Sequence, residues 1–106
     1  MKLEDLSLVE AAAAIHTGTL SPVQYLDSLF NRIEQVESVV QAWVTVDREA
    51  AIAEARKCAA EAQNKKFRGP LHGIPIGIKD IFYTRNLPTT MGSIRFKNFV
   101  PDRDAR

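Results

Sequence analysis

Two helix-start signals near the N-terminus constrain this chain more strongly than any other feature of its sequence. Ser7 and Glu10 have the spacing of a capping box, in which the serine hydroxyl accepts from the amide three residues on and the glutamate reaches back. Ser21 and Gln24 repeat this spacing, and Pro22 occupies the first helical position, where its missing N–H has no cost. The sequence therefore predicts one helix from about residue 8 and another from about residue 22.

The residues that follow these signals predict where the first helix ends and which side of the second is buried. Gly18 can adopt the left-handed conformation common at a helix C-terminus, so the first helix should end near Thr17. In the second helix, apolar residues recur at helical spacing, while polar and charged residues take the other face. This apolar stripe consists of Leu26, Leu29, Phe30, Ile33 and Val36. We predict N-terminal amphipathic helices over residues 1–38.

A strand, a helix and a second strand are expected over residues 39–80. Val39–Val46 is rich in β-branched residues, and Ile74–Lys79 begins with a short apolar run that contains a proline. Between them, Asp47 is expected to cap a helix over about Arg48–Asn64. Alanines on one face of this helix have small side chains that allow close packing. This order is typical of a right-handed parallel crossover and predicts an α/β fold.

Length and composition limit the organisation of the chain. Its 106 residues suit one domain, which we expect to be partial, with residues 81–106 as an irregular segment rich in turn formers. A hydrophobic content of 45% is that of a globular protein. No run approaches the ~18 to 20 apolar residues that cross a bilayer, and the acidic N-terminus is unlike a secretory signal. The single cysteine, Cys58, cannot form an internal disulfide, so we expect a reducing, cytoplasmic location.

Charge is distributed unevenly along the chain. Residues 1–64 hold five basic and ten acidic side chains, whereas residues 65–106 hold nine basic and three acidic ones. A basic C-terminal part could bind nucleic acid, but its arginines and lysines are spread among apolar residues and form no cluster. We expect the two halves to attract each other, and nucleic acid ranks last among the possible partners.

Lys79 is the residue whose position most suggests chemistry. It follows an apolar run, and the C-terminal ends of strands are where α/β sheets place their ligand crevices. A lysine buried among apolar residues such as Ile76 and Ile78 has its pKa lowered toward the range of a general base, whereas a neighbouring carboxylate such as Asp80 favours the ammonium form. From the residues alone, a surface Lys–Asp pair and a catalytic lysine both remain open.

Other polar residues are expected to have supporting roles. His72 lies in a Leu-His-Gly turn and is expected to brace that loop, and Cys58 is expected to be buried and inert. Thr89 and Thr90 could support the lysine or a substrate pocket through hydrogen bonds.

Four ordered blocks of the sequence, together with the helices before them, resemble the N-terminal part of the amidase signature family. The blocks are Gly69–Pro75, Ile78–Asp80, Leu87–Ser93 and Val100–Ala105. The family includes the A subunit of the aminoacyl-tRNA amidotransferases, fatty acid amide hydrolase, and allophanate and malonamide hydrolases. The resemblance implies a serine hydrolase that cleaves amide C–N bonds of small molecules through a Ser, cis-Ser, Lys triad, with Lys79 as its lysine and no metal or cofactor.

The resemblance stops short of the nucleophile. Both serines of the family's triad lie in Gly/Ser-rich segments well downstream of the lysine, and Ser93, the only serine after Lys79, matches a turn block instead. We therefore expect the N-terminal fragment of an amidase, inactive by itself and completed by further polypeptide or by self-association. The alternative is a non-catalytic interaction or scaffold module derived from such an enzyme.

Overall fold

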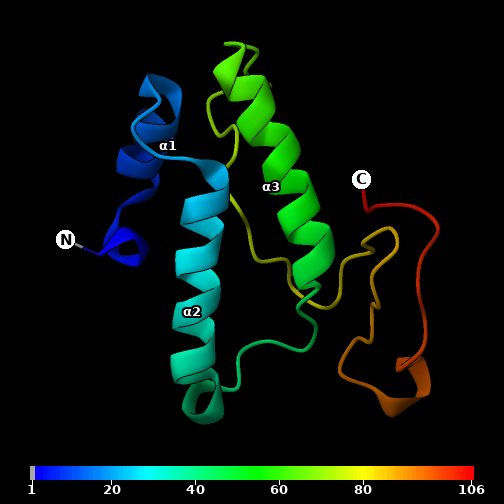
Figure 1. Ribbon diagram of the computed structural model, residues 1–106. Coiled ribbons are helices and arrows are strands. Elements are labelled where there is room, and N and C mark those ends of the chain that lie inside the picture. The colour runs from blue at the N-terminus through cyan, green and yellow to red at the C-terminus, as the bar shows by residue number, and fades with distance from the viewer. Residues whose placement is uncertain (1) are drawn as a thin grey trace. The chain divides into compact units, whose positions relative to one another are not determined.

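The computed structural model describes residues 2–106, which form helices and irregular chain (Figure 1). The three α-helices in this range are α1 (Leu8–Thr17), α2 (Pro22–Val40) and α3 (Arg48–Gln63). Short 3-10 helices lie near the two ends, η1 at Leu3–Asp5 and η2 at Ile94–Phe96. None of the helices described in residues 2–106 is long and apolar enough to cross a bilayer.

Both predicted helix starts are confirmed in atomic detail. The Ser7 amide donates to Glu10 Oε2 at 2.8 Å, and the Glu10 amide donates to Ser7 Oγ at 3.2 Å. A second capping box joins Ser21 and Gln24 at the start of α2. Gly18 ends α1 in the left-handed region, at φ 80°. These local signals therefore determine where α1 begins and ends and where α2 begins.

The chain divides into two compact units. The first comprises the N-terminal residues through Ala42 together with Arg48–Pro75, and the second comprises Trp43–Asp47 with Ile76–Arg106. The prediction of one partial domain with boundaries near residues 38 and 80 stays a prediction. Lys79, Thr89 and Thr90 all belong to the second unit.

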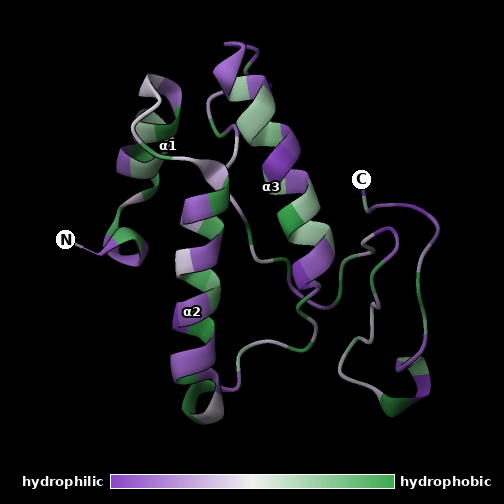
Figure 2. Ribbon diagram, in the orientation of Figure 1, coloured by the Kyte–Doolittle hydropathy of each residue, from purple (hydrophilic) through white to green (hydrophobic). Residues whose placement is uncertain are grey.

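The first unit has two small buried clusters. One gathers residues of α1 and the following turn with the start of α2, namely Ala11, Ile15, Leu20 and Tyr25. The other lies between α2 and α3 and consists of Leu26, Phe30 and Ala55. Figure 2 shows hydrophobic and hydrophilic residues alternating around the turns of α2 and α3, as two amphipathic helices require. The predicted stripe of α2 is thus its packing face, with Leu26 and Phe30 at its centre.

The loop after α3 returns to the start of α2. Gly73 has φ 78°, and a Cβ placed on it would lie 2.7 Å from Cγ of Pro22. Ile74 packs against the cluster around Ile15. The Gly69–Pro75 block therefore closes the first unit immediately before the segment that carries Lys79.

The predicted strand–helix–strand unit is wrong, because residues 2–106 of the structure contain its helix and neither strand. Val39 and Val40 continue α2, where each further residue adds a backbone hydrogen bond. Gln41 ends the helix at φ 49°, and its amide donates to the Glu37 carbonyl at 2.8 Å. Residues 41–47 then run as exposed irregular chain.

The segment Ile74–Lys79 likewise has no β-ladder in the described chain. A strand is defined by its partner, and apolar character alone supplies none. The observed class is therefore helical with irregular segments, whereas the expected helix over Arg48–Asn64 is confirmed to within one residue at its end.

Candidate active site

Lys79 lies on exposed irregular chain of the second unit. The isoleucines before it do not enclose it within the described residues, since Ile76 is 73% and Ile78 52% exposed. One close contact restrains the backbone between them: a Cβ on Gly77 would lie 3.0 Å from Cη2 of Trp43. The side chain of Trp43, from the connection between α2 and α3, therefore packs directly on the segment that carries the lysine.

Asp80, the residue after Lys79, is held by the loop that contains Thr90. The Thr90 amide donates to Asp80 Oδ1 at 2.7 Å, and the Thr90 hydroxyl donates to Oδ2. The Met91 amide donates to the Asp80 carbonyl at 2.9 Å. The two hydrogen bonds from Thr90, the side-chain one foremost, hold the pKa of the Asp80 carboxyl below its usual range. Asp80 thus turns to Thr90, and no ion pair joins it to Lys79 among residues 2–106.

Thr89 belongs to the second unit and is fully buried. Its hydroxyl donates to the Phe82 carbonyl at 3.3 Å and accepts from the Thr84 amide at 3.4 Å. Its own amide donates to the Phe99 carbonyl at 2.9 Å. Thr89 therefore ties three parts of the irregular chain together, while Thr90 reaches the residue next to Lys79. Both threonines thus form hydrogen bonds with residues that follow Lys79 closely in the chain. Their roles toward a substrate stay predictions.

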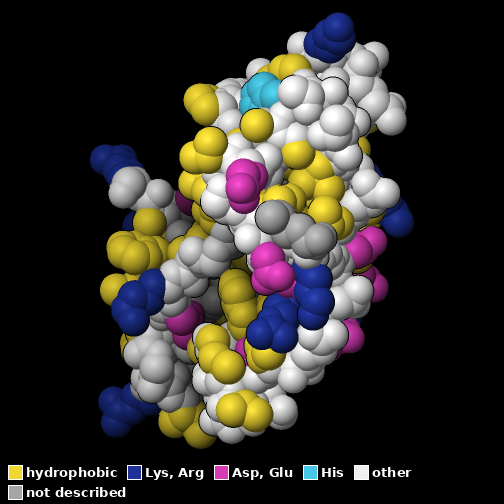
Figure 3. Space-filling model, turned by 90° about the vertical axis from the view of Figure 1, so that its left-hand side faces the viewer, with side chains coloured by type: hydrophobic (Ala, Val, Ile, Leu, Met, Phe, Trp, Pro, Cys, Tyr) yellow, Lys and Arg dark blue, Asp and Glu magenta, His cyan; other side chains and the backbone are white. Residues whose placement is uncertain are grey.

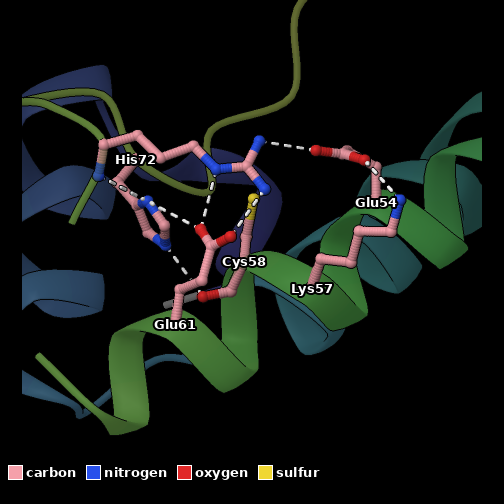
Figure 4. Close-up of polar contacts among 6 residues, drawn as sticks. Glu54, Lys57, Cys58, Glu61 and His72 are labelled. Carbon is pink, nitrogen blue, oxygen red and sulfur yellow. Dashed lines mark hydrogen bonds and ion pairs between the residues drawn. The ribbon is translucent and has the colours of Figure 1, made fainter. Parts of the chain in front are cut away.

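A second polar cluster joins α3 to the loop that follows it (Figure 4). His72 is buried, and its Nδ1 lies 3.0 Å from the Arg68 amide, which can only donate. Nδ1 must therefore accept, so Nε2 carries the ring proton and donates to the Cys58 carbonyl at 2.8 Å. The predicted bracing role of His72 and the burial of Cys58 are confirmed.

The Arg68 side chain completes this cluster, and no motif of the sequence had pointed to it. Its guanidinium donates twice to Glu61, at 2.7 and 2.9 Å, and once to Glu54, at 2.6 Å. The available signal was two glutamates two helical turns apart on α3, followed closely by an arginine. These contacts lower the pKa of both glutamates.

Cys58, Glu61 and His72 place three metal-ligand atoms within 4.8 Å of one another. The arrangement nevertheless does not suit a cation. Both imidazole nitrogens already form hydrogen bonds, and the Glu61 carboxylate pairs with the Arg68 guanidinium, whose positive charge would repel a metal. The ion pairs and hydrogen bonds of this cluster therefore hold the loop that follows α3 against that helix.

Comparison with known proteins places these features in a family. The family model described as Amidase matches residues 24–106. The chain is 41% identical over 100 residues to the A subunit of the glutamyl-tRNA(Gln) amidotransferase of Streptomyces coelicolor, covering 94% of this chain and 20% of that protein. It is 39% identical over 105 residues to the corresponding subunit of Desulfotalea psychrophila, covering 99% of this chain and 21% of the relative.

A third relative is a putative amidase by name, AmiD of Mycobacterium tuberculosis, 36% identical over 103 residues, with 97% of this chain and 22% of that protein covered. The chain thus spans about a fifth of the length of the relatives it matches. The matched region contains Lys79 and the four blocks around it. The chain belongs to the amidase signature family.

Proposed function

We propose that this chain is the N-terminal part of an amidase signature serine hydrolase and supplies its catalytic lysine, Lys79. The observation that carries the proposal is the family match over residues 24–106, which includes the Ile78–Asp80 block and the loop with Thr89 and Thr90. The proposed reaction is hydrolysis of an amide C–N bond in a small molecule, and the relative named AmiD, a putative amidase, supports the amide-hydrolysis part of this proposal.

In the proposed reaction, neutral Lys79 accepts a proton through a bridging serine. The oxygen of a second serine attacks the amide carbonyl carbon, and the proton passes to the nitrogen as the C–N bond breaks. Water then cleaves the acyl ester that has formed on the nucleophilic serine. Residues 1–106 supply only the lysine of this triad, so we propose that they do not hydrolyse amides by themselves.

Further polypeptide is also proposed to cover the second unit. Hydrophobic side chains reach the surface in many places (Figure 3), and in the second unit they include the neighbours of Lys79. The hydrophobic residues of the second unit with the largest exposed fractions are Ile76, Val44 and Ile94, at 73%, 68% and 87%. Such surface is unusual on a stable monomer and fits either further chain or self-association. A cytoplasmic location is proposed because the sole cysteine suits a reducing compartment.

The test begins with the complete reading frame that contains residues 1–106 and the intact mass of its product. A Gly/Ser-rich segment with two serines downstream supports the proposal. A frame that has no such segment overturns it and favours the interaction-module alternative.

The second step measures labelling by a fluorophosphonate, which bonds to an activated serine oxygen with loss of fluoride and requires no knowledge of the substrate. Lys79→Ala is expected to abolish labelling in the expressed product. Lys97→Ala is the matched control, since Lys97 is another exposed lysine of the second unit. Labelling that persists unchanged in Lys79→Ala removes Lys79 from the mechanism.

A further inference from the structure

We infer that Asp80 and Thr90 form a clamp that positions Lys79 for proton transfer, so that both are positioning residues of the active site. This inference rests on the proposed function, because it assigns a role relative to the lysine. It adds a pair of residues that act through Lys79 without touching the reacting atoms.

The geometry fixes the residue next to the lysine from two sides. Both carboxylate oxygens of Asp80 accept from Thr90, one from its amide and one from its hydroxyl, and the Asp80 carbonyl accepts from the Met91 amide. The side chain and the backbone of residue 80 are thus attached to the same turn. Because Lys79 precedes Asp80 directly, the position of its Cα is restrained by this turn.

The turn is itself anchored in the interior of the second unit. Thr89, immediately before Thr90, is fully buried and bonded to Phe82, Thr84 and Phe99. An exposed, irregular segment therefore receives its rigidity from one buried residue and one charged hydrogen-bonded pair. Misplacement of a reacting group by about 1 Å can cost on the order of 100-fold in rate. Loss of the hydrogen bonds that restrain the Lys79 backbone should therefore have a measurable effect on the rate.

The clamp also determines what the carboxylate does. A carboxylate that pairs with a lysine favours the ammonium form, which cannot accept a proton. In this structure the Asp80 oxygens are both engaged by Thr90, and Lys79 forms no ion pair among the residues described. The pair of Asp80 with Thr90 thus takes the place of the Lys–Asp pair that adjacency suggests.

The first experiment tests whether the clamp exists in solution, independently of any activity. Amide hydrogen exchange is measured at Thr90 and Met91 in the product of the complete reading frame that contains residues 1–106. Asp80→Asn removes the charge that both contacts to Thr90 use and is expected to speed exchange of the Thr90 amide at least about 10-fold. The amide of Leu20, in the buried cluster of the first unit, is the internal reference. Unchanged exchange at Thr90 overturns the clamp.

The second experiment tests its role, with fluorophosphonate labelling of the product of the complete reading frame. Thr90→Val removes the hydroxyl but keeps size and backbone amide, and Thr90→Ser restores a hydroxyl. We expect Thr90→Val and Asp80→Asn each to lower the maximal labelling rate roughly 10- to 100-fold with little change in half-saturating probe concentration. Thr90→Ser should label within about threefold of the parent protein.

The double variant and a control separate positioning from loss of fold. Because Thr90→Val and Asp80→Asn break the same contact, the double variant should be no slower than the slower single variant. Lys97→Ala, at an exposed lysine of the same unit, is the control and should label like the parent protein. The clamp is overturned if the rate losses of the two single variants multiply in the double variant. It is also overturned if Thr90→Val labels at the full rate while Lys79→Ala does not label. Full labelling of Lys79→Ala instead overturns the proposed function.

Discussion

Gly73→Ala is the substitution for which this structure makes its sharpest prediction about stability. Two costs add at this position. Gly73 has φ 78°, where an L-residue with a Cβ costs roughly 1–2 kcal/mol. The new Cβ would also meet Pro22 Cγ at 2.7 Å, and the ring of Pro22 is a buried part of the first turn of α2 with little freedom to move. Overpacking of this kind costs typically about 1–3 kcal/mol.

Two other glycines of the same unit separate these contributions. Gly18 has φ 80° but nothing within 4 Å of its added Cβ, so Gly18→Ala should cost only the backbone part, roughly 1–2 kcal/mol. Gly69 has neither a contact within 4 Å nor a left-handed backbone, so Gly69→Ala should leave stability unchanged within about 0.5 kcal/mol. We therefore expect a graded series, with Gly73→Ala lowering the free energy of unfolding by about 2–5 kcal/mol.

The assay is urea unfolding followed by the helical signal in circular dichroism, with equal slopes across the series as the check on a common unfolded state. A Gly73→Ala chain that is wholly unfolded is still informative, because Pro22→Ala in the same chain removes the clashing ring and should recover part of the helical signal. The reasoning is refuted if Gly73→Ala is no more destabilising than Gly18→Ala, or if Pro22→Ala is simply additive with it.

Three further predictions concern caps and charges. Ser7→Ala removes the hydroxyl of the first capping box and should lower the free energy of unfolding by about 1 kcal/mol in the same urea assay. Arg68→Ala should lower the melting temperature less than Gly73→Ala does, because its ion pairs are about half exposed, and 1 M salt should shrink the difference from the parent chain. The pKa values of Glu54 and Glu61 lie below their ordinary value of 4.5, with Arg68 as the main cause, so their contribution is present above pH 4.5 and is lost as the pH falls through the folded values. A parent chain and an Arg68→Ala chain that lose stability in parallel below pH 4.5 would contradict this.

The elements that the sequence predicted correctly depend on signals within a few residues of each other. The Ser7 and Ser21 capping boxes and the left-handed Gly18 are complete in themselves, and the structure contains all three. The strands at Val39–Val46 and Ile74–Lys79 were inferred from residue type alone. Their formation depends on partners elsewhere in a polypeptide, and no local pattern states whether a partner is present.

The candidate site divides in the same way. Lys79 stands out in the sequence because it follows an apolar run, and the four-block pattern around it implies its role. Thr89 and Thr90 are hydrogen-bonding residues in one of those blocks. The pairing of Thr90 with Asp80 was not foreseen, since a turn of irregular chain joins them across ten positions of sequence. Arg68 was missed for a related reason, because its glutamates lie in a helix and the arginine in a loop.

The contact between Trp43 and Gly77 changes how the connection between α2 and α3 should be regarded. Exposed connections of this kind usually tolerate insertions, because lengthening them disturbs neither neighbour. In this chain, one residue added within Trp43–Asp47 would shift an aromatic ring that packs on the backbone two residues before Lys79. Length variation in this connection is therefore coupled to the lysine segment, although both flanking helices could remain intact. An engineer grafting or permuting this chain should cut elsewhere.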